Sequence, residues 1–294
     1  MSAHTNNILT VDVEEWFQVE NYAGLITRDT WPGRQSRVAA SVERLLGLFE
    51  EAGVRATFFV LGWVAERLPD LVPRIAAGGH EIASHGWTHT PIWNLGREEF
   101  REEVTRSRAL LEAQSGRPVV GYRAPTFSVT ARTLWALQEL ARAGYRYDSS
   151  IFPVRHDRYG IPDAPTAIHL REEGLWEIPL SVYPLGRFHL PVAGGGYLRL
   201  FPHSLTRRAI ERLNRREEPA VVYVHPWEFD PGQPRVPGVG LLRTWRHHVG
   251  IGRNLGKLAR LLGEFRFAPA GEVLDTLSAA GRVGQRAAAA GGER

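Results

Sequence analysis

Two histidines that could share a metal ion stand four residues apart in His85-Gly-Trp-Thr-His89. Their imidazole nitrogens suit Zn²⁺, Co²⁺, Ni²⁺ or Fe²⁺, and a third protein ligand would leave open positions for water and substrate. The stretch is not the H-E-x-x-H form of zinc proteases, because Gly86 follows the first histidine. By itself this spacing more often marks surface or core histidines than ligands, so the interpretation depends on the rest of the chain.

Carboxylates near the start of the chain offer the third ligand, in the stretch Val11-Asp12-Val13-Glu14-Glu15. A carboxylate beside two imidazoles is a common ligand set of catalytic zinc. If this stretch ends a strand, alternation sends the side chains of Asp12 and Glu14 to one side and that of Glu15 to the other. Glu14 and Glu15 are both candidates for the ligand, although a D-x-E pair alone is more typical of a solvated strand end.

Three more polar clusters lie farther along the chain, in Arg123-Ala-Pro125, Asp148-Ser-Ser150 and His225-Pro-Trp-Glu228. Each has an ordinary structural alternative: a salt-bridge arginine, an Asx turn or helix cap, and a strand terminator. Together with the metal candidates, the clusters supply what amide hydrolysis needs, namely activated water, a Lewis acid, a base and an acid. His225 must be protonated to act as the acid, and a carboxylate such as Asp148 would raise its pKa.

The elements that must position these residues alternate between strand and helix. Short apolar runs predict strands at 8–13, 56–61, 81–83, 119–122 and 220–224, and helical spacing predicts helices at 36–51, 64–77, 98–114, 130–143, 202–216, 254–262 and 270–280. Residues 150–200 are rich in Pro and Gly and predict loops and short strands. Alternating βα units predict a mainly parallel sheet or barrel with function at the C-terminal strand ends.

Composition excludes several classes of protein. The chain has 294 residues, 43% of them hydrophobic, and no cysteine, so disulfides and thiolate ligands are excluded. The net charge is +4, but basic and acidic residues alternate on helices, as in 97–103, which does not favour nucleic-acid binding. No apolar run approaches the roughly 18–20 residues of a membrane span, and residues 1–7 do not resemble a signal peptide. We expect a cytoplasmic protein, free or peripheral to the inner face of the membrane.

With these clusters in this order, the chain resembles the NodB-type polysaccharide deacetylases (carbohydrate esterase family 4). The stretches Val-Asp-Val-Glu-Glu-Trp-Phe, Gly-Gly-Gly-Tyr-Leu-Arg-Leu and His-Pro-Trp-Glu-Phe-Asp most resemble the subgroup tied to exopolysaccharide and exosortase (PEP-CTERM) loci. The resemblance implies an α/β fold, a distorted (β/α) barrel of mainly parallel strands with a C-terminal extension. We expect a single catalytic domain over 1–294, with a core at about 8–230, the extension at about 231–282 and a frayed tail at 285–294.

The resemblance also implies a role for each site residue. The implied catalytic residues are Asp12 as base, Arg123 as its partner, Thr126 as an oxyanion-hole N–H, His225 as acid and Asp148 as the residue that orients the acid. The implied metal ligands are His85, His89 and Glu14, with Glu15 as the alternative, because the family's usual second aspartate is replaced here. The metal would be Zn²⁺, with Co²⁺ or Ni²⁺ possible, and Trp87, Trp227 and Tyr197 would contact sugar.

The expected reaction is removal of N-acetyl groups from a polysaccharide or its lipid-linked precursor. Three alternatives remain open. A glycosidase could use the Asp-x-Glu pair without a metal, and a small-amide hydrolase of the allantoinase-related branch could use the same barrel. A non-enzymatic glycan-binding protein with a relic site is the third, although base, acid and ligands are all present. The sequence makes no prediction of the oligomeric state.

Overall fold

A curled, mainly parallel β-sheet forms the centre of the computed structural model, which describes residues 6–156, 158–185, 188–192 and 194–283. Its strand order is β10-β1-β2-β3-β4-β5-β7-β6, with β11 also paired to β1. The pairs in this sheet are parallel, except that β6 and β7 are antiparallel. The predicted distorted (β/α) barrel is confirmed as an open, curled form.

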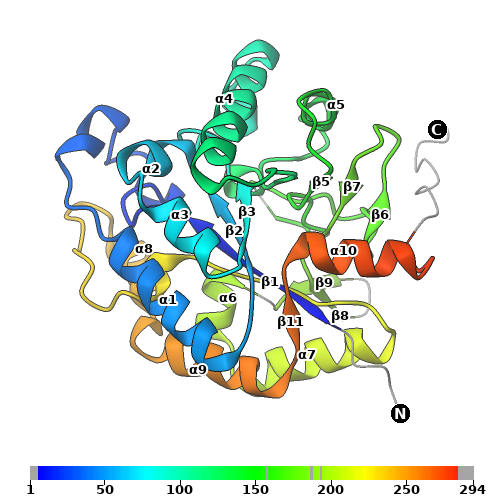
Figure 1. Ribbon diagram of the computed structural model, residues 1–294. Helices are drawn as coiled ribbons and strands as arrows, with labels where there is room; N and C mark the ends of the chain where they lie inside the picture. The colour runs from blue at the N-terminus through cyan, green and yellow to red at the C-terminus, as the bar shows by residue number, and fades with distance from the viewer. Residues whose placement is uncertain (1–5, 157, 186–187, 193, 284–294) are drawn as a thin grey trace.

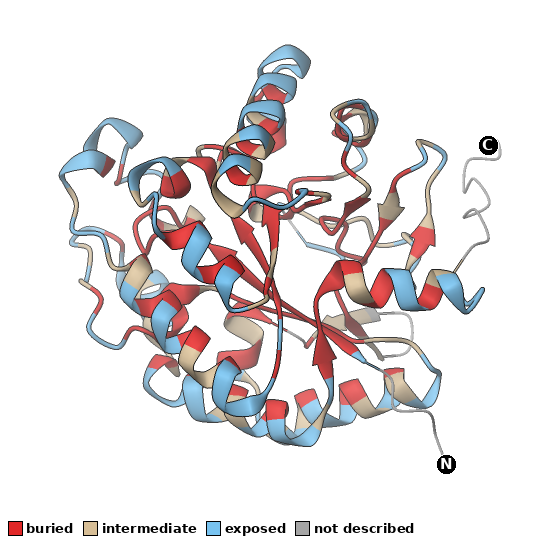
Figure 2. Ribbon diagram, viewed as in Figure 1, coloured by how far each residue is buried: buried red, intermediate tan, exposed pale blue. Residues whose placement is uncertain are grey.

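The strands are short and their side chains are mostly buried on both faces, as expected for a parallel sheet covered by helices (Figure 2). The strands of the main sheet are β1 (Asn7–Val13), β2 (Thr57–Val60), β3 (Glu81–Ser84), β4 (Gly121–Tyr122), β5 (Tyr147–Asp148), β6 (His169–Leu170), β7 (Trp176–Glu177), β10 (Val221–Val224) and β11 (Phe267–Ala268). A separate antiparallel pair is formed by β8 (Val182–Leu185) and β9 (Phe188–Pro191).

Amphipathic helices surround the outside of the sheet (Figure 1). In α1, Val42, Leu45 and Phe49 are fully buried against the strands, and the helix stops at Gly53 in a left-handed conformation. The helices are α1 (Val38–Ala52), α2 (Gly62–Arg67), α3 (Leu71–Ala77), α4 (Arg97–Ser115), α5 (Trp135–Arg142), α6 (Gly195–Leu200), α7 (His203–Arg215), α8 (Leu241–His248), α9 (Ile251–Glu264) and α10 (Ala270–Ala279).

Two predicted helices differ from the observed ones. The helix expected at 64–77 is broken into α2 and α3 around Pro69, because proline restricts the preceding residue and lacks the N–H that would continue the helix. The helix expected at 130–143 begins later, at Trp135. The tail expected at 285–294 lies outside the described residues, and no described helix is both long and apolar enough to span a bilayer.

The register of the sheet brings the ends of distant strands to one edge. Val11 pairs with Val224, Asp12 with Phe59 and Val60 with Ser84. The same row continues through Tyr122 to Asp148. The polar residues that follow β1, β3, β4 and β10 are therefore placed together at the C-terminal edge of the sheet.

Candidate metal and catalytic site

Three ligand atoms meet at this edge, from Glu14 after β1 and from His85 and His89 after β3. The atoms lie within 4.8 Å of one another, which is close enough to hold one metal ion. Nε2 of His89 is 2.6 Å from Oε2 of Glu14. Glu14 and His85 are buried and His89 is partly buried, so the group is fixed in the floor of the site.

His85 is held in the form that a metal requires. Its Nδ1–H donates to the backbone carbonyl of Arg123 at 2.8 Å, because a carbonyl can only accept, and this leaves the lone pair of Nε2 free. Burial lowers the pKa of His85 to about 4, although the charges of Asp12 and Glu14 oppose this effect. The imidazole is therefore neutral at pH 7, as a ligand must be.

The two candidate glutamates point in different directions. The indole N–H of Trp227 donates to Oε1 of Glu14 at 2.9 Å. Burial raises the pKa of Glu14, but the charges of His89 and His225 outweigh it and hold the pKa well below its ordinary value. Glu15 instead accepts from the backbone N–H of Arg37 at 3.1 Å, on the other side of the strand end, and burial raises its pKa. Of the two glutamates, Glu14 is the one whose carboxylate joins the group formed with His85 and His89.

Asp12 lies beside the metal group in a buried ion pair. Nη1 of Arg123 donates to Oδ1 of Asp12 at 2.7 Å, and both side chains are almost fully buried. The guanidinium also donates to the hydroxyls of Thr10 and Ser149 and to the carbonyl of Ser149. A buried charge pair is tolerated when its hydrogen-bonding groups are satisfied in this way, and the result is a carboxylate with a fixed orientation.

His225 closes the site from β10. Its Nε2 lies 3.9 Å from Oδ2 of Asp12 and 3.8 Å from Oε1 of Glu14, and its Nδ1 lies 3.2 Å from Oε2 of Glu228. Glu228 in turn pairs with Arg199 at 2.8 Å. Burial lowers the pKa of His225, but the carboxylates of Glu14, Glu228 and Asp12 outweigh it and raise the pKa to about 9. The imidazole therefore carries a proton at neutral pH.

These groups open into a cavity of about 180 Å³. Its lining residues are Asp12, Glu14, Val19, Glu20, Asn21, His85, His89, Ala124, Thr126, Phe127, Tyr159, His225 and Trp227. Three non-glycine residues of the lining, His89, Thr126 and Phe127, have left-handed backbone conformations with φ between 51° and 56°. Such conformations cost energy and gather at functional sites. The buried Oγ1 of Thr126 has no hydrogen-bond partner among the described residues.

Comparison with known proteins shows which fold surrounds this cavity. A profile of the polysaccharide deacetylase family matches residues 24–147. A crystal structure from Mycobacterium smegmatis, of a protein assigned as a polysaccharide deacetylase, is similar over the whole of both chains, with a TM-score of 0.63 and 21% identity. Residues 24–147 are therefore similar to the polysaccharide deacetylases. The chain as a whole has the fold of these deacetylases.

Curated relatives match shorter segments of the chain. A peptidoglycan-N-acetylglucosamine deacetylase of Bacillus cereus is 30% identical over 97 residues, 33% of this chain and 35% of its own. A chitooligosaccharide deacetylase of Sinorhizobium fredii is 38% identical over 82 residues, 28% of this chain and 38% of its own. The chain thus spans little more than a third of the length of the relatives that it matches.

The site is not confined to the matched deacetylase segment. A second profile, described as a domain of unknown function (DUF3473), matches residues 149–275 and includes His225. Asp12 and Glu14 precede both matches. Because β1 pairs with both β2 and β10, one sheet joins all three parts of the chain, and the candidate base, ligands and acid meet only when it is assembled.

The carboxylate of Asp148 is engaged by groups other than His225. It accepts from the hydroxyl and backbone N–H of Ser150. Burial, together with the charge of Asp148, raises the pKa of Glu177 well above its ordinary value. The carboxylate against His225 is Glu228 instead. Glu228 stands three residues after His225 and forms a capping box with it, so the His-x-x-Glu spacing was the available signal.

Of the three side chains expected to contact sugar, Trp227 is the one that lines the cavity. Trp227 lines the cavity and stacks on His225, with ring centroids 5.3 Å apart. Trp87 packs against Gly62 and under the guanidinium of Arg106, 3.5 Å from its ring centroid, and is not among the lining residues. Tyr197, on α6, is likewise outside the lining, and Tyr159 supplies the tyrosine there.

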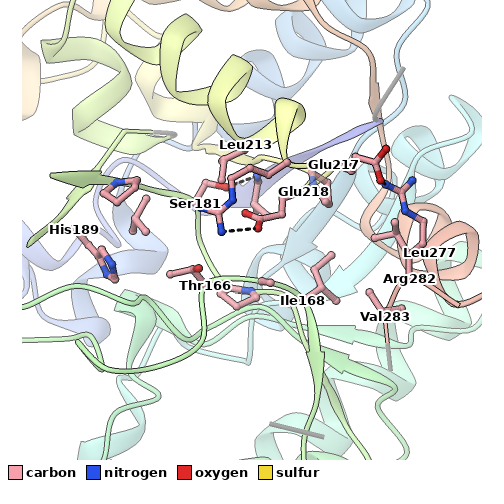
Figure 3. Close-up of a pocket in the computed structure, with 17 residues that line it drawn as sticks. Thr166, Ile168, Ser181, His189, Leu213, Glu217, Glu218, Leu277, Arg282 and Val283 are labelled. Carbon is pink, nitrogen blue, oxygen red and sulfur yellow. Dashed lines mark hydrogen bonds and ion pairs between the residues drawn. The ribbon is translucent and has the colours of Figure 1, made fainter. Parts of the chain in front are cut away.

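A larger cavity, of about 480 Å³, lies toward the opposite edge of the sheet, at the beginning of β10 (Figure 3). Its charged residues are largely satisfied by one another, since Arg216 pairs with Glu218 and Arg282 with Glu217. Among the described residues, the only group of three or more potential metal ligands is the one formed by Glu14, His85 and His89. The smaller cavity is therefore the one lined by the candidate metal ligands and catalytic residues.

Proposed function

We propose that this protein is a metal-dependent hydrolase that removes N-acetyl groups from a glycan. The observation that carries the proposal is the convergence of Asp12, His225 and the group Glu14, His85 and His89 on one cavity. The names of the matched relatives, which include deacetylases of peptidoglycan and of chitooligosaccharides, support the same reaction class. We infer that the whole chain acts as one catalytic domain, since the site draws on all parts of it.

The donor set fits a divalent metal. Two imidazole nitrogens and one carboxylate suit Zn²⁺, and Co²⁺ or Ni²⁺ would suit them as well. Glu14, His85 and His89 would hold the ion. The hydrogen bond that Trp227 donates to Glu14 would orient the first of these ligands, and the one that His85 donates to the carbonyl of Arg123 would orient the second. When bound, the ion would polarise the acetyl carbonyl and increase the acidity of a water molecule.

The residues of the chain would move the protons. Asp12, fixed by Arg123, would accept a proton from the attacking water. His225, held in its protonated form by Glu228, would donate a proton to the departing amine nitrogen. The backbone N–H of Thr126, at the rim of the cavity, would donate to the oxyanion that forms on the former carbonyl oxygen. Trp227 and Tyr159 would contact the sugar ring.

We propose an exopolysaccharide, or its lipid-linked precursor, as the glycan. This finer assignment follows from the resemblance of three motifs to the exosortase-associated subgroup. The volume of the cavity, about 180 Å³, supports a polymer as substrate, because only the acetamido group of one sugar has to enter it while the rest of the polymer stays outside.

The test combines metal analysis with an acetate-release assay on N-acetylglucosamine oligomers. Glu14→Ala is expected to lose both bound metal and activity, whereas Glu15→Ala should retain bound metal. A chelator should abolish activity and added Zn²⁺ should restore it. Release of reducing ends instead of acetate, with activity that survives chelation, would identify a glycosidase and refute the proposal.

A further inference from the structure

A cluster of apolar side chains lies exposed on and beside α8. Leu241, Leu242 and Trp245 are 92%, 66% and 55% exposed, and Leu25, on the loop after β1, is 48% exposed. We call these four residues the apolar face. The methyl groups of Leu25 lie against Gly238, just before α8, so the two segments are neighbours. An exposed cluster of this kind marks a binding surface more often than a scattered single leucine does.

The chain segment that contains α8 carries charge of one sign. From residue 231 to residue 263 the chain has no acidic residue, and its basic residues are Arg235, Arg243, Arg246, Arg253, Lys257 and Arg260. Lys257 is engaged, because its ammonium donates to three backbone carbonyls. The five arginines are exposed, and within the described parts of the chain none of them has an ion-pair partner. The alternation of charge expected from the sequence therefore does not extend to this segment.

The elements that carry the apolar face also contact the candidate active site. His247, on the inner side of α8, stacks on Trp227 at 4.5 Å between ring centroids, and Trp227 stacks on His225. The loop that carries Leu25 also carries Glu20 and Asn21, which line the cavity. In Figure 1 the blue loop after β1 and the gold segment leading to α8 both lie at the left edge of the molecule.

We propose that α8 and the loop around Leu25 dock on the surface of an anionic lipid bilayer. A short helix that exposes leucine and tryptophan between arginines matches the interfacial region, where apolar side chains enter the acyl boundary and arginines meet anionic headgroups. A second copy of the chain fits less well, because a two-fold contact would bring the unpaired arginines of both copies together. Nucleic acid fits less well because two of the three exposed apolar side chains of α8 are leucines, which cannot stack on bases.

Docking in this way would place the mouth of the cavity beside the membrane. This surface adds to the proposed function and does not depend on it, since lipid binding needs neither metal nor catalysis. If the proposed function also holds, the consequence is a preference for glycans attached to a lipid.

The test is co-sedimentation with vesicles of phosphatidylcholine, with and without phosphatidylglycerol. We expect binding only to the anionic vesicles, and weaker binding as salt is added. The combined variant Leu241→Ser, Leu242→Ser and Trp245→Ser should bind at least about tenfold more weakly. Arg243→Gln should reduce the partition coefficient by about fivefold, whereas the matched Arg117→Gln, at the far end of α4, should leave it unchanged.

Three results would overturn the proposal. The first is equal binding of the wild type and the triple serine variant. The second is absence of binding to anionic vesicles together with a dimer in light scattering that the triple variant converts to monomer, which would assign the face to a second copy. The third is binding to a single-stranded oligonucleotide but not to vesicles. The triple variant should keep its melting temperature and its acetate release from soluble oligomers, because the substituted side chains are exposed. If the wild type itself released no acetate, the proposed function would be refuted, and the proposal of lipid binding would be unaffected.

Discussion

The buried carboxyl pair of Asp148 and Glu177 makes the stability of the fold depend on pH. Burial raises the pKa of Asp148 to about 6, and burial together with the charge of Asp148 raises the pKa of Glu177 well above its ordinary value. Carboxyl groups with raised pKa keep a proton in the folded state at pH values where the unfolded chain has lost it. Their contribution to stability is therefore full below about pH 4, the unfolded pKa, and declines as pH rises toward the folded values.

The substitution Glu177→Gln isolates this effect. A glutamine can still accept from the backbone N–H of Ile151, which Glu177 does at 3.0 Å, and its amide can donate to Asp148. One proton held only by the folded state changes the free energy of unfolding by about 1.4 kcal/mol per pH unit. Between about pH 5 and about pH 7, the wild type should therefore lose about 3 kcal/mol relative to Glu177→Gln.

The assay is urea unfolding of both proteins at several pH values across this range, followed by circular dichroism. Glu172→Gln, at an exposed position nearby, is the matched control and should follow the wild type at every pH. A constant difference between Glu177→Gln and the wild type would show that the pair does not retain a proton, and the reasoning from burial would be refuted.

The remaining predictions concern the site. Glu228→Gln should lower kcat by about tenfold or more and leave KM nearly unchanged, because it removes a carboxylate that orients His225 and raises its pKa. Its pH profile should lose activity at a lower pH on the basic side, and an unshifted profile would contradict the assignment. Trp227→Phe should weaken metal binding by about tenfold in a competition titration, since it deletes the N–H donated to Glu14 and keeps an aromatic ring at the position. Zn²⁺ at about 100 times its Kd should stabilise the wild type by about 2.7 kcal/mol in thermal unfolding and should not stabilise Glu14→Ala; equal shifts in both proteins would indicate a different metal site.

Much of the fold follows from the sequence because its periodicities are strong. The run Ile8–Val13 and the spacing of Val42, Leu45 and Phe49 predict β1 and α1 within a few residues. The strand-end rule then groups Asp12 with His85 and His225, although they are far apart in the chain. What made this possible is that parallel strands place their C-terminal ends on one edge.

Other features could not be predicted, for identifiable reasons. α8 shows no inward apolar period, because its leucines and tryptophan face outward. That the carboxylate of Asp148 is bonded to Ser150, and that Glu228 lies against His225, depends on local side-chain geometry that strand order alone does not specify. Trp87 follows His85 by two residues, yet its ring turns back over Gly62 and away from the cavity.

The pairing of β1 with β10 has a consequence for anyone who shortens this chain. A fragment ending after residue 148 would retain the matched deacetylase segment but lose β10, which lies beside Ile8 to Val11. The backbone amides and carbonyls along that side of β1 would then form a bare, apolar border open to other chains. Such a truncated product should accumulate as aggregates, so expression trials and domain-swap designs should carry both halves of the sheet.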